Sequence, residues 1–266
     1  MPEPRIRPTE LADWLISRGK HWVQVDDIES TLNLDRQQAW NAISDLKRRG
    51  MLFSPTRGAY VPIPPEYRSW GAVPATHFVD PLMKHLDRNY YVGLLSAAEL
   101  HGAAHQRPQV FQVVTDRQLQ PKDFGRVRLR FFTTRYTSDR PTLKMNTPTG
   151  TMQVATPEVT LLDLVNWQYD SGGISNVGSI ARELVENDSV DAHRLADAAQ
   201  SYPSSLSART GWILGTVAPG GLDLSELNAI ASERTEVVPL SPGGPTVGVI
   251  DHQWNLRINT SFEPES

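Results

Sequence analysis

The segment from residue 33 to residue 52 places the strongest constraint on the fold of this chain of 266 residues. Ala39, Ile43 and Leu46 recur at the spacing of one helical face, so they predict a single apolar stripe. Asp35 stands where a helix begins, and basic residues followed by Gly50 stand where one ends. The opposite face would carry amide, hydroxyl and guanidinium groups, contributed by Gln37, Asn41, Ser44 and Arg48.

The elements around this helix follow the order of a winged helix-turn-helix. Two short helices are predicted before it, from Thr9 to Arg18 and from Asp26 to Leu32. A small hairpin is predicted after it, with strands Met51–Ser54 and Ala59–Val61 around the turn Pro55–Gly58. We therefore expect a winged helix-turn-helix at the N-terminus.

The polar face of the central helix suits DNA recognition. A helix fits the major groove of B-DNA, where amide side chains pair with adenine and arginine reads guanine or holds phosphate. Base contacts are expected from Arg36, Gln37, Gln38, Asn41 and Ser44. Phosphate contacts, which position a protein without specifying sequence, are expected from Lys47 and Arg48, and Arg57 at the hairpin tip is placed for the minor groove or the backbone.

Other interpretations of this face stay open. Winged helices also dock on proteins, and polar helix faces are usually only solvated. Residues 1–70 hold 10 basic and 9 acidic residues, which is little positive charge for a DNA-binding unit. Trp40 lies on the flank of the face, where it packs either on a sugar or on the hairpin.

The remainder of the chain predicts a larger α+β domain. The proline-rich segment 62–74 is interpreted as a linker or boundary, so the expected domains are residues 1–66 and residues 67–266. Strands are expected at 109–115, 126–130 and 152–154, and a strong helix begins at Thr156. Further helices are expected near 175–187, 190–200, 204–215 and 223–233, and two closing strands between 246 and 260. The predicted fold class is α+β: an N-terminal winged helix-turn-helix followed by a larger mixed α/β domain.

A second basic surface is predicted within the larger domain. In the segment RVRLR, Arg126, Arg128 and Arg130 alternate with apolar residues, so a strand would place all three on one face. Such a ladder could extend a nucleic-acid footprint, or it could be the solvated face of an antiparallel sheet.

Composition limits the other classes of function. The net charge is −4, yet residues 151–266 alone hold 15 acidic and 5 basic residues. The chain has no cysteine, no leader-like apolar segment at its start and no run long enough for a membrane helix, so we expect a cytoplasmic protein.

We expect no enzyme, metal or cofactor. His101 and His105 have a metal-pair spacing, but Gly102 between them disfavours a helix and no acid completes the motif. Glu158 and Asp163 flank a leucine-rich helix, where they are expected to cap and to be solvated.

The chain also resembles the AbiEi family, through motifs that occur in a fixed order over most of its length. They are LLSAAELHGAA at 94–104, GTMQVATPEVTLLDLV at 150–165, GG at 172–173, GWILG at 211–215 and WNLRIN at 254–259. AbiEi proteins are the antitoxin and repressor halves of type IV abortive-infection toxin–antitoxin systems.

The resemblance implies a transcriptional autorepressor that binds inverted repeats in the promoter of its own operon. It also implies an antitoxin role for the C-terminal domain, against a nucleotidyltransferase-like toxin and without a stable complex between the two. On the helix and hairpin, the family's DNA contacts are carried over to Gln37, Gln38, Asn41 and Arg57. The alternative is a protein-interaction module whose acidic C-terminal half binds a basic partner, without specific DNA binding.

Overall fold

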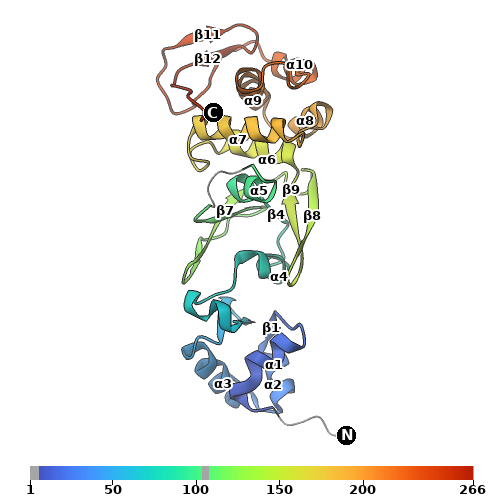
Figure 1. Ribbon diagram of the computed structural model, residues 1–266, viewed down its shortest axis with the longest axis vertical. Coiled ribbons are helices and arrows are strands. Elements are labelled where there is room, and N and C mark those ends of the chain that lie inside the picture. Colours follow the sequence, from blue (N-terminus) through green and yellow to red (C-terminus); the bar gives the residue numbers. More distant parts are fainter. Residues whose placement is uncertain (1–5, 104–107, 266) are drawn as a thin grey trace.

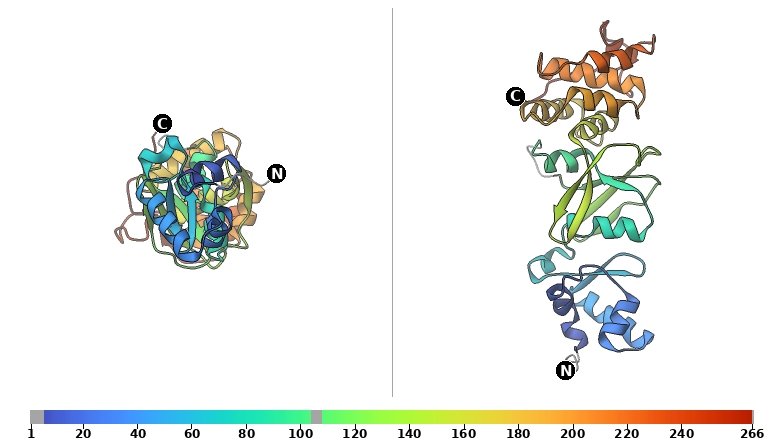
Figure 2. Two further views of the ribbon diagram at one scale, coloured as in Figure 1. Left: turned by 90° about the horizontal axis from the view of Figure 1, so that it is seen from below. Right: turned by 90° about the vertical axis from the view of Figure 1, so that its right-hand side faces the viewer.

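The computed structural model describes residues 6–103 and 108–265. The molecule is elongated, and its elements form three tiers along the long axis (Figure 1). The N-terminal helices make one end, a β-sheet makes the middle, and a helical layer with a small sheet makes the other end. Seen along the long axis, the tiers lie over one another, and the side view repeats the same order (Figure 2).

The N-terminal tier contains three α-helices and a hairpin. Ala39, Ile43 and Leu46 are at most 2% exposed, so the predicted apolar stripe is confirmed. Together with side chains from the two preceding helices they form a separate hydrophobic cluster. The three strands make an antiparallel sheet in the order β1-β3-β2. The elements are η1 (Pro8–Glu10), α1 (Leu11–Ser17), β1 (Val23–Gln24), α2 (Val25–Leu32), α3 (Arg36–Arg48), β2 (Leu52–Thr56) and β3 (Ala59–Pro62).

The proline-rich segment 62–74 is packed, which differs from the linker that its composition suggested. It contains the short helix η2 (Pro65–Trp70), and Ile63 and Val73 are buried in the larger hydrophobic cluster of the molecule. Phe53 of the hairpin also belongs to that larger cluster, where its ring lies 5.2 Å from that of Phe78. The N-terminal tier therefore rests directly on the middle one, and the division at residue 66 stays a prediction.

The middle tier is a six-stranded mixed sheet in the order β6-β7-β5-β4-β9-β8. The pairs β5–β7 and β4–β9 are parallel and the other neighbours are antiparallel. The strands expected near 109–115, 126–130 and 152–154 are present as β5, β7 and β9. The elements of this tier are η3 (Ala75–His77), α4 (Val79–His85), β4 (Tyr90–Val92), α5 (Leu94–Leu100), β5 (Phe111–Thr115), β6 (Lys122–Phe124), β7 (Val127–Thr133), β8 (Thr142–Thr147) and β9 (Gly150–Ala155).

The third tier packs five helices and a three-stranded sheet above the middle one. The four helices predicted after Gly173 are all present, each within a few residues of its expected bounds. Trp254 closes the small sheet onto α9, and a Cβ at Gly211 would lie 2.1 Å from its ring, so glycine is needed there. The elements are α6 (Pro157–Asn166), α7 (Ile174–Glu186), α8 (Ala192–Ala199), α9 (Ser204–Val217), α10 (Ser225–Ser232), β10 (Val238–Pro239), β11 (Val249–Asp251) and β12 (Leu256–Ile258).

Helix α6 corrects the expectation that Glu158 and Asp163 cap a helix and are solvated. Both carboxylates are buried, at 2% and 0% exposure. Thr156 caps the helix instead, and its side chain accepts a hydrogen bond from the Val159 amide. Glu158 accepts a hydrogen bond from the backbone of Asp191 at 3.1 Å, so it ties α6 to the start of α8.

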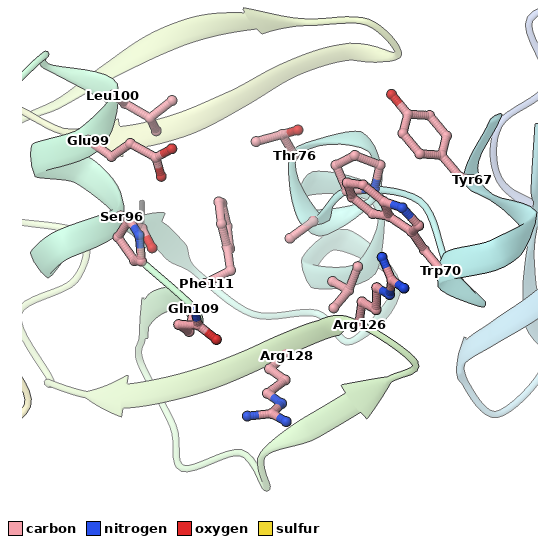
Figure 3. Close-up of a pocket in the computed structure, with 14 residues that line it drawn as sticks. Tyr67, Trp70, Thr76, Ser96, Glu99, Leu100, Gln109, Phe111, Arg126 and Arg128 are labelled. Atoms are coloured by element: carbon pink, nitrogen blue, oxygen red, sulfur yellow. The ribbon is translucent and has the colours of Figure 1, made fainter. Parts of the chain in front are cut away.

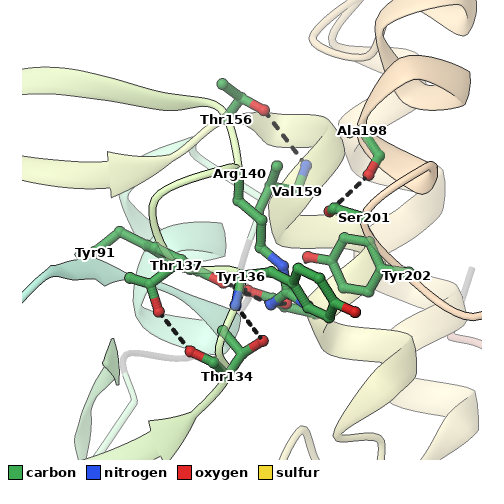
Figure 4. A network of polar contacts seen from close by, with 11 residues as sticks. Tyr91, Thr134, Tyr136, Thr137, Arg140, Thr156, Val159, Ala198, Ser201 and Tyr202 are labelled. Atoms are coloured by element: carbon green, nitrogen blue, oxygen red, sulfur yellow. Dashed lines mark hydrogen bonds and ion pairs between the residues drawn. The ribbon is translucent and has the colours of Figure 1, made fainter. Parts of the chain in front are cut away.

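Asp163 is the centre of a buried polar network that joins the sheet to the helical layer, and Figure 4 labels its partners Tyr91, Arg140 and Tyr202. Its carboxylate accepts hydrogen bonds from Arg140 at 2.9 Å, from Tyr202 at 2.7 Å and from Tyr91 at 2.9 Å. The Arg140 guanidinium also stacks on the Tyr202 ring, 3.8 Å from its centroid. Arg140 is 6% exposed, so it contributes nothing to the basic surface that the sequence suggested for this region.

We expect Arg140→Met to destabilise the protein by about 3–5 kcal/mol at neutral pH, because it leaves the Asp163 carboxylate buried without its countercharge. The loss should be smaller at pH 5 than at pH 8, since the stranded carboxyl group can then take up a proton. Urea unfolding at both pH values measures this. Arg135→Met, an exposed arginine of the same loop, is the control and should change stability by less than about 0.5 kcal/mol. Equal effects of the two substitutions would contradict the role of the network.

Candidate nucleic-acid interface

Helix α3 begins with a reciprocal capping arrangement that fixes its first turn. The Asp35 carboxylate accepts a hydrogen bond from the Gln38 amide at 2.8 Å, and the Gln38 side-chain oxygen accepts one from the Asp35 amide at 3.2 Å. The side-chain oxygen of Gln38 is thus engaged within the helix terminus. The side-chain nitrogen of Gln38 is therefore the atom that we expect to contact a base.

The middle of the exposed face presents two amides one helical turn apart. Gln37 donates a hydrogen bond to the Asn41 side-chain oxygen at 3.3 Å, and both residues are exposed. The pair aligns two side chains that can each bind the edge of an adenine. Ser44 lies exposed one turn further along the same face.

Arg36 is held by acids of the preceding helix. Its guanidinium forms ion pairs with Asp26 and, at 3.2 Å, with Glu29. The hydrogen bond that Arg36 donates to Asp26, together with the charge of Glu29, raises the pKa of Arg36. Sequence reasoning placed Asp26 at a helix cap, and nothing local in the sequence indicates that the packing of α2 on α3 brings it to Arg36. The positive charge of Arg36 is therefore largely offset within the protein.

The end of α3 shows the same internal pairing. Arg48 and Arg49 both form ion pairs with Asp45, on the preceding turn. Lys47 is exposed, and within the described residues no ion pair involves it. Trp40 is 42% exposed and meets the Tyr60 ring edge-on at 6.5 Å between centroids, so it packs on the hairpin.

Arg57 lies exposed at the tip of the β2–β3 hairpin, as predicted. The turn is closed by Gly58, whose φ of +80° favours glycine. The Ser54 hydroxyl donates to the Thr56 and Ala59 carbonyls and so stabilises the turn. The structure thus holds Arg57 on a stabilised turn of the hairpin on which Trp40 of α3 packs.

The second basic surface is divided rather than continuous. Arg130 forms an ion pair with Asp123 at 2.7 Å, whereas Arg126 and Arg128 line a cavity of about 710 Å³ together with Trp70 and Phe111 (Figure 3). The turn before β7 is pressed against η2, and the Arg126 amide donates to the Trp70 carbonyl at 3.0 Å. The predicted alternation is present, with Val127 and Leu129 buried.

The described part of the chain was searched for groups of metal ligands and for helices that could span a membrane. Residues 6–103 and 108–265 contain no group of three or more histidine, aspartate or glutamate side chains that could hold a metal ion. The His101 ring is hydrogen-bonded to the Ala155 carbonyl at 2.8 Å, and His105 lies outside the described residues. None of the described helices has the length and apolar character needed to cross a bilayer.

The fold and this surface define an α+β protein with a polar helix face at one end and a sheet joined to a helical layer. Comparison with family models matches residues 91–216 to the AbiEi antitoxin C-terminal domain. This match supports the assignment of residues 91–216 to an AbiEi-type antitoxin domain, which runs from β4 into α9 and contains the Asp163 network.

The fold also has a solved counterpart. The crystal structure of the RV2827C protein from Mycobacterium tuberculosis superposes with a TM-score of 0.67 at 16% sequence identity, over 96% of this chain and 94% of that one. At this identity the likeness concerns the fold, and it extends over the N-terminal tier as well as the AbiEi domain. No curated protein sequence matches the chain.

Proposed function

We propose that this protein is a sequence-specific DNA-binding regulator that represses its own toxin–antitoxin operon and acts as its antitoxin. The N-terminal tier would be a winged helix-turn-helix, with α3 in the major groove and the β2–β3 hairpin as the wing. The target would be promoter DNA with inverted repeats. The role is regulatory rather than enzymatic, and it would be exercised in the cytoplasm.

The exposed face of α3 carries the DNA-binding part of this proposal. Its opposite side is fully used in packing, so the helix presents one fixed face, and that face holds an aligned pair of amides. Amides that lie one turn apart and lack a buried role are suited to reading base edges. Lys47 and Arg57 flank the pair and would hold phosphates. Arg126 and Arg128 would extend the footprint toward the middle tier.

The antitoxin part of the proposal rests on the AbiEi domain over residues 91–216. A protein with that domain implies a toxin as its functional partner. We propose a nucleotidyltransferase-like toxin encoded beside it, which the antitoxin opposes without forming a stable complex. The toxin gene is co-expressed with the unmodified antitoxin or with its Arg140→Met variant. The comparison measures whether growth rescue depends on an intact domain.

The first test of the regulator is a salt-titrated binding assay with the full chain and its own upstream DNA. A scrambled fragment of equal length is the control. Specific binding supports the proposal. The logarithm of the affinity should then fall linearly with the logarithm of the salt concentration, with a slope of about 0.9 for each phosphate neutralised. Equal and weak binding to both fragments would contradict it and would favour a protein-docking role for the N-terminal tier.

Gln37→Ala combined with Asn41→Ala should remove discrimination between operator and scrambled DNA, because the two amides would read base edges. Each lost base contact corresponds to about 1–3 kcal/mol of specificity. Lys47→Ala is the matched control on the same helix: it should weaken both fragments alike and reduce the salt slope by about 0.9. Fluorescence anisotropy with both DNA fragments measures the ratio. Unchanged discrimination in the double variant would exclude α3 as the reading helix.

Asp26→Asn should increase affinity for all DNA sequences by roughly two- to fivefold, which is the usual strength of an exposed ion pair. The substitution releases the Arg36 guanidinium from one of its two acidic partners. Asp27→Asn is the control at the adjacent position, where the carboxylate accepts a hydrogen bond from the Gln24 amide and does not meet Arg36. A gain of equal size in both variants would show that only the general loss of negative charge matters.

A further inference from the structure

Large apolar side chains are exposed mainly at the C-terminal tip of the molecule. Seven such residues are exposed in the described chain, and four of them lie between residues 237 and 250. Three of the four lie at or next to β11 and define what we call the tip patch: Val247, Val249 and Ile250. A fifth, Tyr169, reaches the same segment through a hydrogen bond with Ser241 at 2.8 Å. A concentration of this kind on a folded surface marks an interaction site.

The core of the tip patch is a strand with one open edge. Strand β11 pairs with β12 on one side, and the sheet order β10-β12-β11 leaves its other side without a neighbouring strand among the described residues. Val249 is 78% exposed and Ile250 is 38% exposed. Since successive side chains point to opposite faces, both faces of this edge are open. Figure 1 shows β11 and β12 at the extreme end of the third tier, beyond α9.

This edge is held in place by hydrogen bonds from β12 and from the residue that follows it. The segment before β11 is anchored by Arg257, which donates to the Thr246 carbonyl at 2.6 Å, and by Asn259, which donates to the Pro245 carbonyl at 2.8 Å. Natural edge strands are commonly blocked by charged side chains or proline. Here the edge strand β11 has three residues, of which Val249 and Ile250 are exposed and apolar and Asp251 is acidic, so its charge disfavours an acidic strand and suits a basic one.

The charge around the tip identifies the kind of partner that fits. Residues 218–265 contain seven carboxylate side chains and two arginines. Both arginines are engaged with backbone carbonyls: Arg257 as described, and Arg234 with the carbonyls of Glu236 and Trp254. Glu233 and Glu236 are exposed, and no ion pair involves them in the described part of the chain. The small sheet therefore carries acidic residues on both of its sides: Asp251 on β11, and Glu233 and Glu236 shortly before β10.

We propose that the tip patch is a docking site for an extended, basic segment of a partner protein, which adds to the small sheet as a fourth strand beside β11. Backbone hydrogen bonds to the open edge would supply affinity, and apolar side chains alternating with lysine or arginine would match the valines and the acidic surroundings. This site lies at the opposite end of the molecule from α3, so it is independent of DNA binding and its failure would leave the proposed regulator untouched.

The probe is a labelled nine-residue peptide of alternating valine and lysine, titrated against the full chain by fluorescence anisotropy. The matched peptide with glutamate in place of lysine should bind at least tenfold more weakly. Two further versions of the peptide carry N-methyl groups, one on all valines and the other on all lysines. Each version blocks the hydrogen-bonding groups along one edge of the peptide strand and keeps the charge. Strand addition requires that at least one version loses binding tenfold or more. If both bind like the parent peptide, attraction is only electrostatic and the proposal is overturned.

Variants of the protein locate the site. Val249→Lys should weaken the valine–lysine peptide at least tenfold and leave the unfolding midpoint unchanged, because Val249 is exposed. Leu143→Lys is the matched control: Leu143 is 44% exposed on β8, the outer strand of the six-stranded sheet, and its substitution should leave binding unchanged. Equal losses in the two variants would overturn the assignment to β11.

A second copy of the chain is the competing occupant. Sedimentation equilibrium of the unmodified chain and of Val249→Lys distinguishes it. A monomer in both cases is the expected result. A dimer that dissociates in the variant would show that the patch is covered by another copy, and it would overturn the proposal of a basic partner.

Discussion

The ion pair between Arg140 and Asp163 is the interaction on which the upper two tiers depend. Burial raises the pKa of Asp163, whereas the charge of Arg140 and the hydroxyls of Tyr202 and Tyr91 lower it. The resulting pKa is about 6, so the carboxylate is ionised at neutral pH. Two charges taken out of water gain little net stability, but breaking the set is costly. Because its members come from β4, the loop after β7, α6 and the loop before α9, the network sets how the helical layer sits on the sheet.

The N-terminal tier is joined to this body in a different way. Its hydrophobic cluster contains no side chain of the six-stranded sheet. Aromatic rings contribute to its contact with the middle tier: the Phe53 ring lies 5.2 Å from that of Phe78 and 5.4 Å from that of Phe124. One exposed ion pair, Arg68 with Asp13 at 2.9 Å, ties η2 to α1. The face of α3 is thus built by local packing and then presented at one end of a long body, while the tip patch is presented at the other.

The sequence predicted what depends on local spacing and missed what depends on partners far along the chain. The helices α3 and α7–α10 were found because their apolar residues recur at helical spacing. The three-residue strand β4 was missed because only its pairing with β5 and β9, further along the chain, makes it a strand. Asp163 was expected to be solvated because its partner Arg140 lies 23 residues away and reaches it only in the folded chain. The proline-rich segment was interpreted as a linker because composition does not record that Ile63 and Val73 are buried.

The same limit applies to charge, and it changes what the candidate interface can be. Arginine outnumbers lysine 21 to 5, and arginine is suited to contacts with phosphate and guanine. In the structure, Arg36, Arg48 and Arg130 each have an acidic partner, and Arg140 is buried. Such pairing offsets part of the positive charge that would neutralise phosphates, and phosphate neutralisation usually supplies much of the affinity for DNA. A helix whose amides are exposed and whose arginines are paired is better suited to discriminating between base sequences than to binding the backbone. Discrimination is what an operator-specific repressor requires.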